Sequence, residues 1–191
     1  MDSTDVIADG DFVPWPPRES NGAASYISST VTTVSFVIFV SMATILDHGS
    51  VSYLVSIFRI GTILKSVCLL AVFVLVHELI HAALFAAFGA KPRFGMVRTA
   101  GLPYFYVSGA GIRLDKNRQL VVVVAPTILL TAIGILLMYS VPFLRTTLVL
   151  TLTMHLAGCV CDLRLVHLLL RLPKCAKIED QENGIRIYAN C

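Results

Sequence analysis

His77-Glu78-Leu79-Ile80-His81 lies within a long apolar stretch of the chain. This stretch runs over residues 62–88, 27 in all, and is mostly Leu, Val, Ala and Phe outside the motif. A helix of that length is about 40 Å long, which exceeds the roughly 30 Å hydrocarbon core of a bilayer. The sequence therefore predicts a membrane-spanning helix that carries a His-Glu-x-x-His motif.

The spacing of the motif is typical of a zinc site. Residues four apart lie on the same face of a helix, so His77 and His81 can offer two imidazole nitrogens to one metal ion. In metalloproteases with this spacing the Glu, here Glu78, is the general base that takes a proton from zinc-activated water. Charged side chains near a bilayer centre cost about 2.5–3.5 kcal/mol each on insertion scales and are usually functional. The motif therefore favours Zn²⁺ binding over a purely structural polar cluster.

The composition is that of an integral membrane protein. The 191 residues are 56% hydrophobic and 14% charged, whereas soluble domains carry about 25% charged residues. We expect one membrane metalloprotease-like domain at 26–172, between a polar acidic N-terminal tail at 1–25 and a polar C-terminal tail at 173–191. The net charge of +3 includes no basic stripe with interleaved aromatics, which argues against a nucleic-acid partner. The five cysteines form no CxxC pair and are predicted to be reduced thiols.

The predicted fold class is all-α integral membrane, with about four transmembrane helices. The predicted spans are 26–46, 62–88, 120–139 and 146–170, whereas 51–61 is too short to cross and is predicted to lie at the interface. Gly89 and Pro92 follow the second span and suit its end. Residues 91–118 contain two short β-like stretches around a turn, so a β-hairpin-like loop is expected between the second and third spans. The edge of such a hairpin could pair with an extended substrate peptide, although an ordinary amphipathic loop fits as well.

The basic residues predict the orientation of the chain. Four spans place both tails and the 89–119 loop on the same side of the membrane. That side carries eleven Lys and Arg residues: Arg18, Lys91, Arg93, Arg98, Arg113, Lys116, Arg118, Arg171, Lys174, Lys177 and Arg186. The opposite side carries Arg59, Lys65 and Arg145. Because basic loops favour the cytoplasm, both termini of this multi-pass protein are predicted to be cytoplasmic.

A catalytic zinc ion usually has three protein ligands and one open position. The fourth span offers His155, Cys159 and Asp162 on one helical face, together with Gly158, which is predicted to let helix backbones approach closely. Asp162 lies about 15 Å from the cytoplasmic end of its helix, the same depth as the motif, whereas Cys159 and His155 lie about 4.5 Å and about 10 Å deeper. Asp162 is therefore the favoured third ligand. Cys159 and His155 remain alternatives, and His155 could instead be a core histidine or contact the substrate.

The sequence resembles the site-2-protease class of intramembrane zinc metalloproteases. The resemblance rests on the motif, the following Phe88-Gly89-Ala90-Lys91-Pro92, the pair Ala125-Pro126 and a late Asp. More narrowly, the sequence resembles a small membrane group described as putative zincin peptidases. The resemblance implies that His77 and His81 are ligands, Glu78 the general base and Asp162 the third ligand. Asp162 follows Gly158-Cys159-Val160-Cys161, whereas the better-known members have an Asp-Gly sequence at this point.

The sequence therefore predicts zinc-dependent intramembrane proteolysis. The partners are the lipid bilayer and a transmembrane or membrane-associated protein substrate, whose peptide bond is hydrolysed by water that Glu78 activates. Two alternatives belong to other classes. One is a non-catalytic metal-binding membrane protein, a transporter or sensor, and the other is an inactive protease-like scaffold.

Overall fold

The computed structural model describes residues 10–14, 21–47, 52–99, 102–181 and 184–188. The helices are α1 (Asn21–Leu46), α2 (Ser52–Ile57), α3 (Ile60–Ala87), α4 (Lys116–Ser140), α5 (Arg145–Gly158) and α6 (Val160–Arg171), with a 3-10 turn at Pro142–Leu144. The strands are β1 (Asp11–Pro14), β2 (Lys91–Thr99), β3 (Leu102–Ala110), β4 (Leu114–Asp115), β5 (Lys177–Gln181) and β6 (Gly184–Tyr188). The protein is thus mostly helical with antiparallel strands.

Three helices in the described residues are long and apolar enough to cross a membrane, namely α1, α3 and α4. The predicted fourth span is divided into α5 and α6, which are bent relative to each other. The two helices add a fourth crossing only if together they form one broken span. The division occurs at Cys159, where the backbone leaves helical geometry at ψ 4°. α2, within the segment predicted to be interfacial, has only six residues.

The chain folds as two compact units. The first contains residues 1–19, 78–126 and 162–191, and the second contains 20–77 and 127–161. The boundary between them falls inside α3 and α4 and near the start of α6. The predicted division into two tails and one domain stays a prediction.

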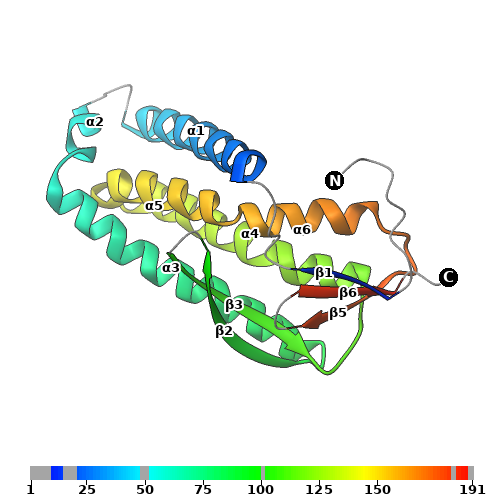
Figure 1. Cartoon of the computed structure of the whole chain (residues 1–191). Helices are drawn as coiled ribbons and strands as arrows, with labels where there is room; N and C mark the ends of the chain where they lie inside the picture. Colours follow the sequence, from blue (N-terminus) through cyan, green and yellow to red (C-terminus); the bar gives the residue numbers. More distant parts are fainter. Residues whose placement is uncertain (1–9, 15–20, 48–51, 100–101, 182–183, 189–191) are drawn as a thin grey trace. The chain divides into compact units, whose positions relative to one another are not determined.

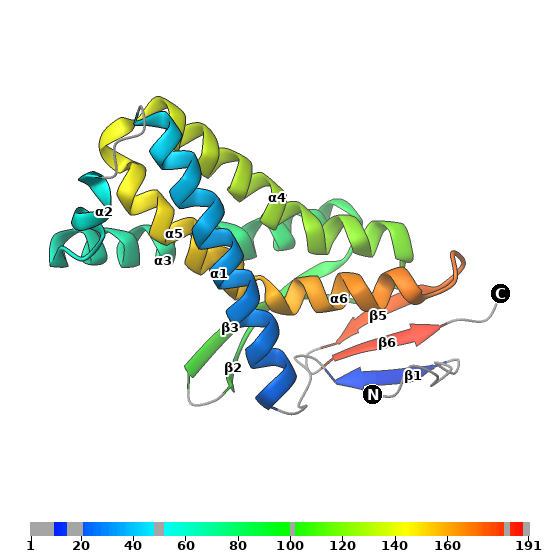
Figure 2. The same cartoon turned by 90° about the horizontal axis from the view of Figure 1, so that it is seen from above.

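The first unit is built on two antiparallel sheets. β2 and β3 form the hairpin that the sequence predicted, with nine paired positions from Lys91–Ala110 to Thr99–Leu102. The second sheet has the strand order β1-β6-β5-β4, and Figure 2 shows β5, β6 and β1 side by side. Its core combines Ile178, Ile185 and Ile187 with Leu165 and Leu169, which lie four residues apart on one face of α6. The sheet therefore buries its apolar side under an amphipathic helix.

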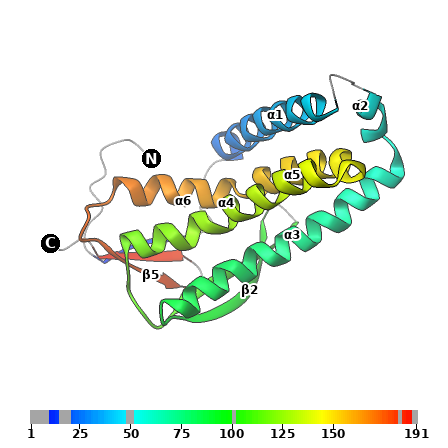
Figure 3. The same cartoon turned by 180° about the vertical axis from the view of Figure 1, so that it is seen from behind.

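The second unit is a helical bundle in which α1 lies alongside α5 (Figure 1) and α2 packs near the start of α5 (Figure 3). Arg145, the first residue of α5, ties three helices together at one end. Its guanidinium donates to the carbonyls of Met138 at 3.0 Å and Leu46 at 3.1 Å, and it pairs with the carboxylate of Asp47. These bonds satisfy carbonyls at the ends of α1 and α4 that lack helical partners.

The expectation of five reduced cysteines was wrong for Cys175, which is disulfide-bonded. Cys68, Cys159 and Cys161 are free thiols, as expected. Cys175 follows the helices, in the polar C-terminal stretch, and the lack of a CxxC pair does not exclude a disulfide to a cysteine at another spacing.

Candidate metal and catalytic site

The His-Glu-x-x-His motif lies on one helix, as predicted. α3 carries His77, Glu78 and His81, so the two histidines are one turn apart on the same helical face. The helix ends just before Gly89, whose φ of +87° is the left-handed conformation that favours glycine at this position. Both histidines are buried, with 7% of His77 and 8% of His81 exposed.

The ring of His81 is held in one orientation by the backbone of α4. Its Nδ1 lies 3.0 Å from the carbonyl oxygen of Val122. A carbonyl only accepts hydrogen bonds, so Nδ1 donates and the lone pair of neutral His81 is on Nε2. In a regular helix the Val122 carbonyl would accept from residue 126, but Pro126 has no N–H. The proline inside α4 thus leaves the Val122 carbonyl available for the histidine.

The Nε2 atom of His81 faces Asp162. The distance from Nε2 to Oδ2 is 4.0 Å, and the Asp162 side chain is 17% exposed. Around a tetrahedral zinc ion with bonds of about 2.0–2.1 Å, two donors lie about 3.3 Å apart, so an approach of about 0.7 Å would let this pair share one ion. Asp162 lies in the first turn of α6, where the helix dipole stabilises a carboxylate. The break at Cys159 is what gives Asp162 this position at the start of a new helix.

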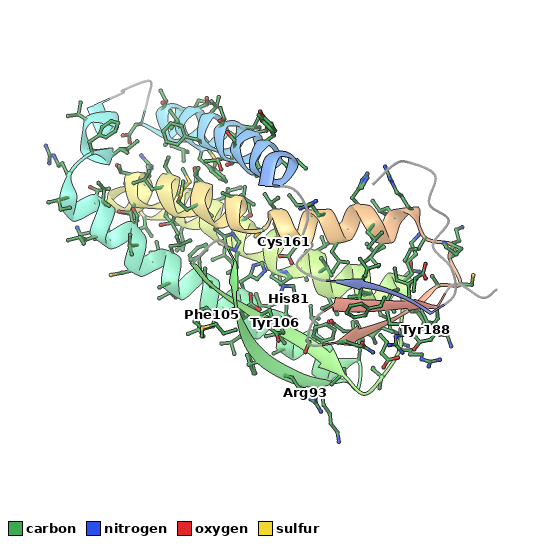
Figure 4. All side chains as sticks on the ribbon, viewed as in Figure 1. His81, Arg93, Phe105, Tyr106, Cys161 and Tyr188 are labelled. Atoms are coloured by element: carbon green, nitrogen blue, oxygen red, sulfur yellow. The ribbon has the colours of Figure 1, made fainter. Side chains whose placement is uncertain are left out.

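A cavity of about 60 Å³ adjoins this pair. Its polar lining comes from Glu78, His81, Gln119, Asp162 and Asp180, with further residues from β3, α4, β5 and β6. Figure 4 labels His81 of α3 and Tyr106 of β3, two of the side chains around it. The cavity has room for water molecules next to a carboxylate that can accept a proton. Glu78, the predicted base, and Asp162, the favoured ligand, therefore lie on the same cavity as His81.

Gln119 and Asp180, which also line this cavity, were not predicted from the sequence. Gln119 is 1% exposed, and among the described residues its Oε1 has no hydrogen-bond partner. Asp180 accepts a hydrogen bond from the Gly109 N–H at 3.4 Å, and burial raises its pKa to about 7. An amide in the first turn of an apolar span was a signal that could have identified Gln119. Asp180 lies between Glu179 and Gln181 in a polar stretch and gave no such signal.

The alternative ligands His155 and Cys159 lie beside His77 within the second unit. His77 Nδ1 is 3.1 Å from His155 Nε2, and the Cys159 sulfur is 3.9 Å from the first atom and 3.8 Å from the second. Asp162 was favoured over these two residues on the assumption that the whole motif lies at one depth. His77 and His81 are about 6 Å apart along the helix, which is enough to give them different neighbours.

A family model described as "Putative zincin peptidase" matches residues 70–177, more than half of the chain. The match includes the motif on α3, the hairpin, α4 and Asp162. No curated protein and no solved structure matches the sequence significantly. On the extent of the family match, this chain belongs to the family described as putative zincin peptidases.

Proposed function

We propose that the protein is an intramembrane zinc metalloendopeptidase of the site-2-protease class, which hydrolyses a peptide bond of a transmembrane or membrane-associated protein. One observation carries the proposal: His81 Nε2 and Asp162 Oδ2 lie 4.0 Å apart beside a cavity that Glu78 also lines. The zincin family supports a zinc peptidase, and the apolar helices α1, α3 and α4 support a membrane setting.

His77, His81 and Asp162 would hold the zinc ion. Two imidazoles and one carboxylate are an established ligand set for catalytic zinc, and three protein ligands leave one position open. The hydrogen bond from His81 to the Val122 carbonyl fits this role, because metal-binding histidines usually donate their other N–H to a fixed acceptor. Zinc in this position would supply Lewis acidity, polarising the scissile carbonyl and making bound water more acidic.

Glu78 is the proposed general base. It is partly buried and lines the cavity without being one of the three ligands. Its carboxylate takes the proton from the attacking water and then delivers it to the nitrogen of the leaving amine. A general base of this kind contributes about 10²–10⁴-fold to a reaction rate.

The hairpin and Gln119 are the proposed substrate contacts. Phe94 and Met96 on β2 and Phe105 on β3 are exposed, and Met96 pairs with Phe105, so the hairpin offers an apolar surface. An extended peptide can add to a free strand edge through backbone hydrogen bonds. The buried Oε1 of Gln119 is an acceptor for a substrate N–H, since leaving such an oxygen unsatisfied costs about 1–3 kcal/mol.

The proposed topology has four crossings with both termini in the cytoplasm. β1 and β6 pair in one sheet, so the chain must cross the membrane an even number of times between them. α1, α3 and α4 supply three crossings, and α5 with α6 supplies the fourth. The eleven basic residues favour the cytoplasmic side, whereas a disulfide at Cys175 favours an oxidising compartment. Labelling of single cysteines introduced next to β1 and β6 with a membrane-impermeant maleimide in intact cells decides between these orientations.

Comparison of the wild type with Glu78→Gln tests the peptidase activity. The full chain, reconstituted in lipid vesicles with single-span test proteins, is expected to cleave them, with activity lost on chelation and restored by Zn²⁺. Glu78→Gln is expected to bind zinc normally and to cleave about 10²–10⁴-fold more slowly. Glu179→Gln, a partly buried carboxylate on β5 that does not line this cavity, serves as the matched control. Equal cleavage by wild type and Glu78→Gln would overturn the proposed mechanism, and bound zinc without any cleavage would favour a metal-binding protein.

A further inference from the structure

His77, His155 and Cys159 form a compact cluster in the second unit, which we call the thiol cluster. The three side chains are 7%, 3% and 3% exposed. Their facing atoms, two ring nitrogens and one sulfur, lie within 4.8 Å of one another. The cluster contains no carboxylate, in contrast to the pair His81–Asp162.

The local structure holds the cluster together. His155 and Cys159 are four residues apart, and the Cys159 N–H donates to the His155 carbonyl at 3.0 Å as the last helical bond of α5. Phe73, one turn before His77 on α3, packs edge-on against the His155 ring with centroids 5.7 Å apart. The ring of His155 is thus fixed between an aromatic side chain and His77. These contacts would reduce the entropy lost when all three side chains bind one ion.

The spacings match those of a tetrahedral metal. Around a zinc ion with Zn–N bonds of about 2.0–2.1 Å and Zn–S bonds of about 2.3 Å, two nitrogens lie about 3.3 Å apart and a nitrogen and a sulfur about 3.6 Å apart. The cluster shows 3.1 Å between the two nitrogens, and 3.9 Å and 3.8 Å from the nitrogens to the sulfur. Changes of about 0.3 Å bring all three atoms to bonding distance of one ion.

We propose that the thiol cluster is a second metal site, which binds one thiophilic divalent cation such as Zn²⁺ or Cd²⁺ through His77 Nδ1, His155 Nε2 and Cys159 Sγ. Two imidazoles and one thiolate are softer ligands than imidazoles with a carboxylate, so the site prefers softer ions than the His81–Asp162 pair does. Binding displaces the thiol proton, which is released to solvent.

The thiol cluster and the proposed catalytic site both use the imidazole ring of His77, so they compete for it. This inference rests on the proposed function. A neutral imidazole has one lone pair. When His77 binds through Nδ1, its Nε2 carries the proton and cannot bind a second metal. Occupation of the thiol cluster therefore withdraws His77 from the proposed catalytic ligands, and an excess of a thiophilic metal acts against catalysis.

Cobalt spectroscopy of the full chain in detergent tests the second site independently of peptidase activity. After removal of metal, titration with Co²⁺ is expected to produce thiolate-to-cobalt charge-transfer absorption in the near ultraviolet. The absorption is expected to persist in Asp162→Asn and to disappear in Cys159→Ser and His155→Gln. Cys161→Ser, a free cysteine two residues away, is the matched control and is expected to keep it. Thermal melting of each variant verifies folding.

Three outcomes overturn the proposal: no charge-transfer absorption in the wild type at saturating Co²⁺, absorption that survives in Cys159→Ser, or absorption that is lost in Asp162→Asn as well. The last result would show a single site that uses both Cys159 and Asp162. Failure of the proposed peptidase would instead appear as absent cleavage in the vesicle assay, with the cobalt result unaffected.

Discussion

The His81–Asp162 pair and the thiol cluster are both groups of possible metal ligands, but their surroundings differ. The first has a carboxylate ligand, a backbone acceptor that orients its histidine, and a cavity with a further carboxylate, Glu78. The second is almost completely buried and consists of two imidazoles and a thiol. Hydrolysis needs room for water and a base next to the metal, and only the first group offers both. Ligand chemistry alone therefore does not identify a catalytic centre.

Removal of one histidine from each group is expected to give the largest difference in zinc affinity between two variants. His81→Ala removes a proposed ligand and is expected to weaken the zinc binding that supports cleavage by more than the roughly 10–100-fold that loss of an outer hydrogen-bond partner costs. His155→Ala removes a neighbour of His77 Nδ1 but no proposed ligand of the catalytic zinc. This variant is expected to weaken the same zinc binding by about 10–100-fold at most. Activity measured against buffered free Zn²⁺ gives both values. A larger loss in His155→Ala would reverse the assignment of the two groups.

Pro126→Ala tests how the first group is oriented. The substitution restores an N–H that can bond to the Val122 carbonyl, in competition with His81 Nδ1. Zinc affinity is expected to fall about 10–100-fold, because the ring of His81 loses its fixed acceptor. The thiol cluster should keep its cobalt absorption. Unchanged zinc affinity would show that the proline does not position His81.

A pair of glycine substitutions compares packing around the two groups. A Cβ on Gly109 would lie 2.3 Å from a ring carbon of buried Phe85, so Gly109→Ala is expected to destabilise the first unit by about 1–3 kcal/mol. A Cβ on Gly158, beside Cys159, would meet no described atom within 4 Å, and Gly158→Ala is expected to be neutral or slightly stabilising. Chemical denaturation of both variants measures the difference. If Gly109→Ala were as stable as the wild type, β3 would have to be able to move away from α3.

The carboxyl of Asp180, in the cavity beside the His81–Asp162 pair, is expected to make the stability of the protein depend on pH. The pKa of its carboxyl is about 7 in the folded chain, against a normal value of 3.8, because burial disfavours the ionised form. Between these two pH values the folded state binds more protons at this carboxyl than the unfolded state, so the stability that Asp180 contributes is complete below about pH 4 and is lost as the pH rises to about 7. Asp180→Asn is expected to remove this decline, as measured by melting temperature across the range. Glu179→Gln is the control, since the hydrogen bond from Tyr188 lowers the pKa of Glu179.

Much of the helical architecture was predictable because apolar length and composition determine it. The motif helix, the third helix and the hairpin appear where the sequence placed them. The four-stranded sheet was not predicted, because β1 and β4 have four and two residues and lie outside any long apolar run. In β6, Ile185 and Ile187 flank the exposed Arg186 and are buried in the sheet.

At the candidate site, the sequence identified residues whose chemistry is unusual in an apolar helix, namely His77, Glu78, His81 and Asp162. It could not identify residues that matter through tertiary contacts. The role of Pro126 depends on a histidine from another helix, and Asp180 reaches the cavity from β5, far along the chain from the motif. The prediction that Gly158 allows close helix approach was wrong. At Gly134 the lack of a side chain instead makes room for the Leu152 side chain of α5, which a Cβ there would overlap.

The pairing of β1 with β6 has a consequence for how the protein is made. The two strands are about 170 residues apart in the chain. At about 5–20 residues per second, roughly 10–30 s of synthesis separate them, so β1 leaves the ribosome long before its partner exists. During that time its hydrogen-bonding edge is open to other strands, as is common for slow, non-local pairings. The sheet that lines the cavity through β5 and β6 therefore forms last, and the cavity acquires Asp180 only after all the helices have been synthesised.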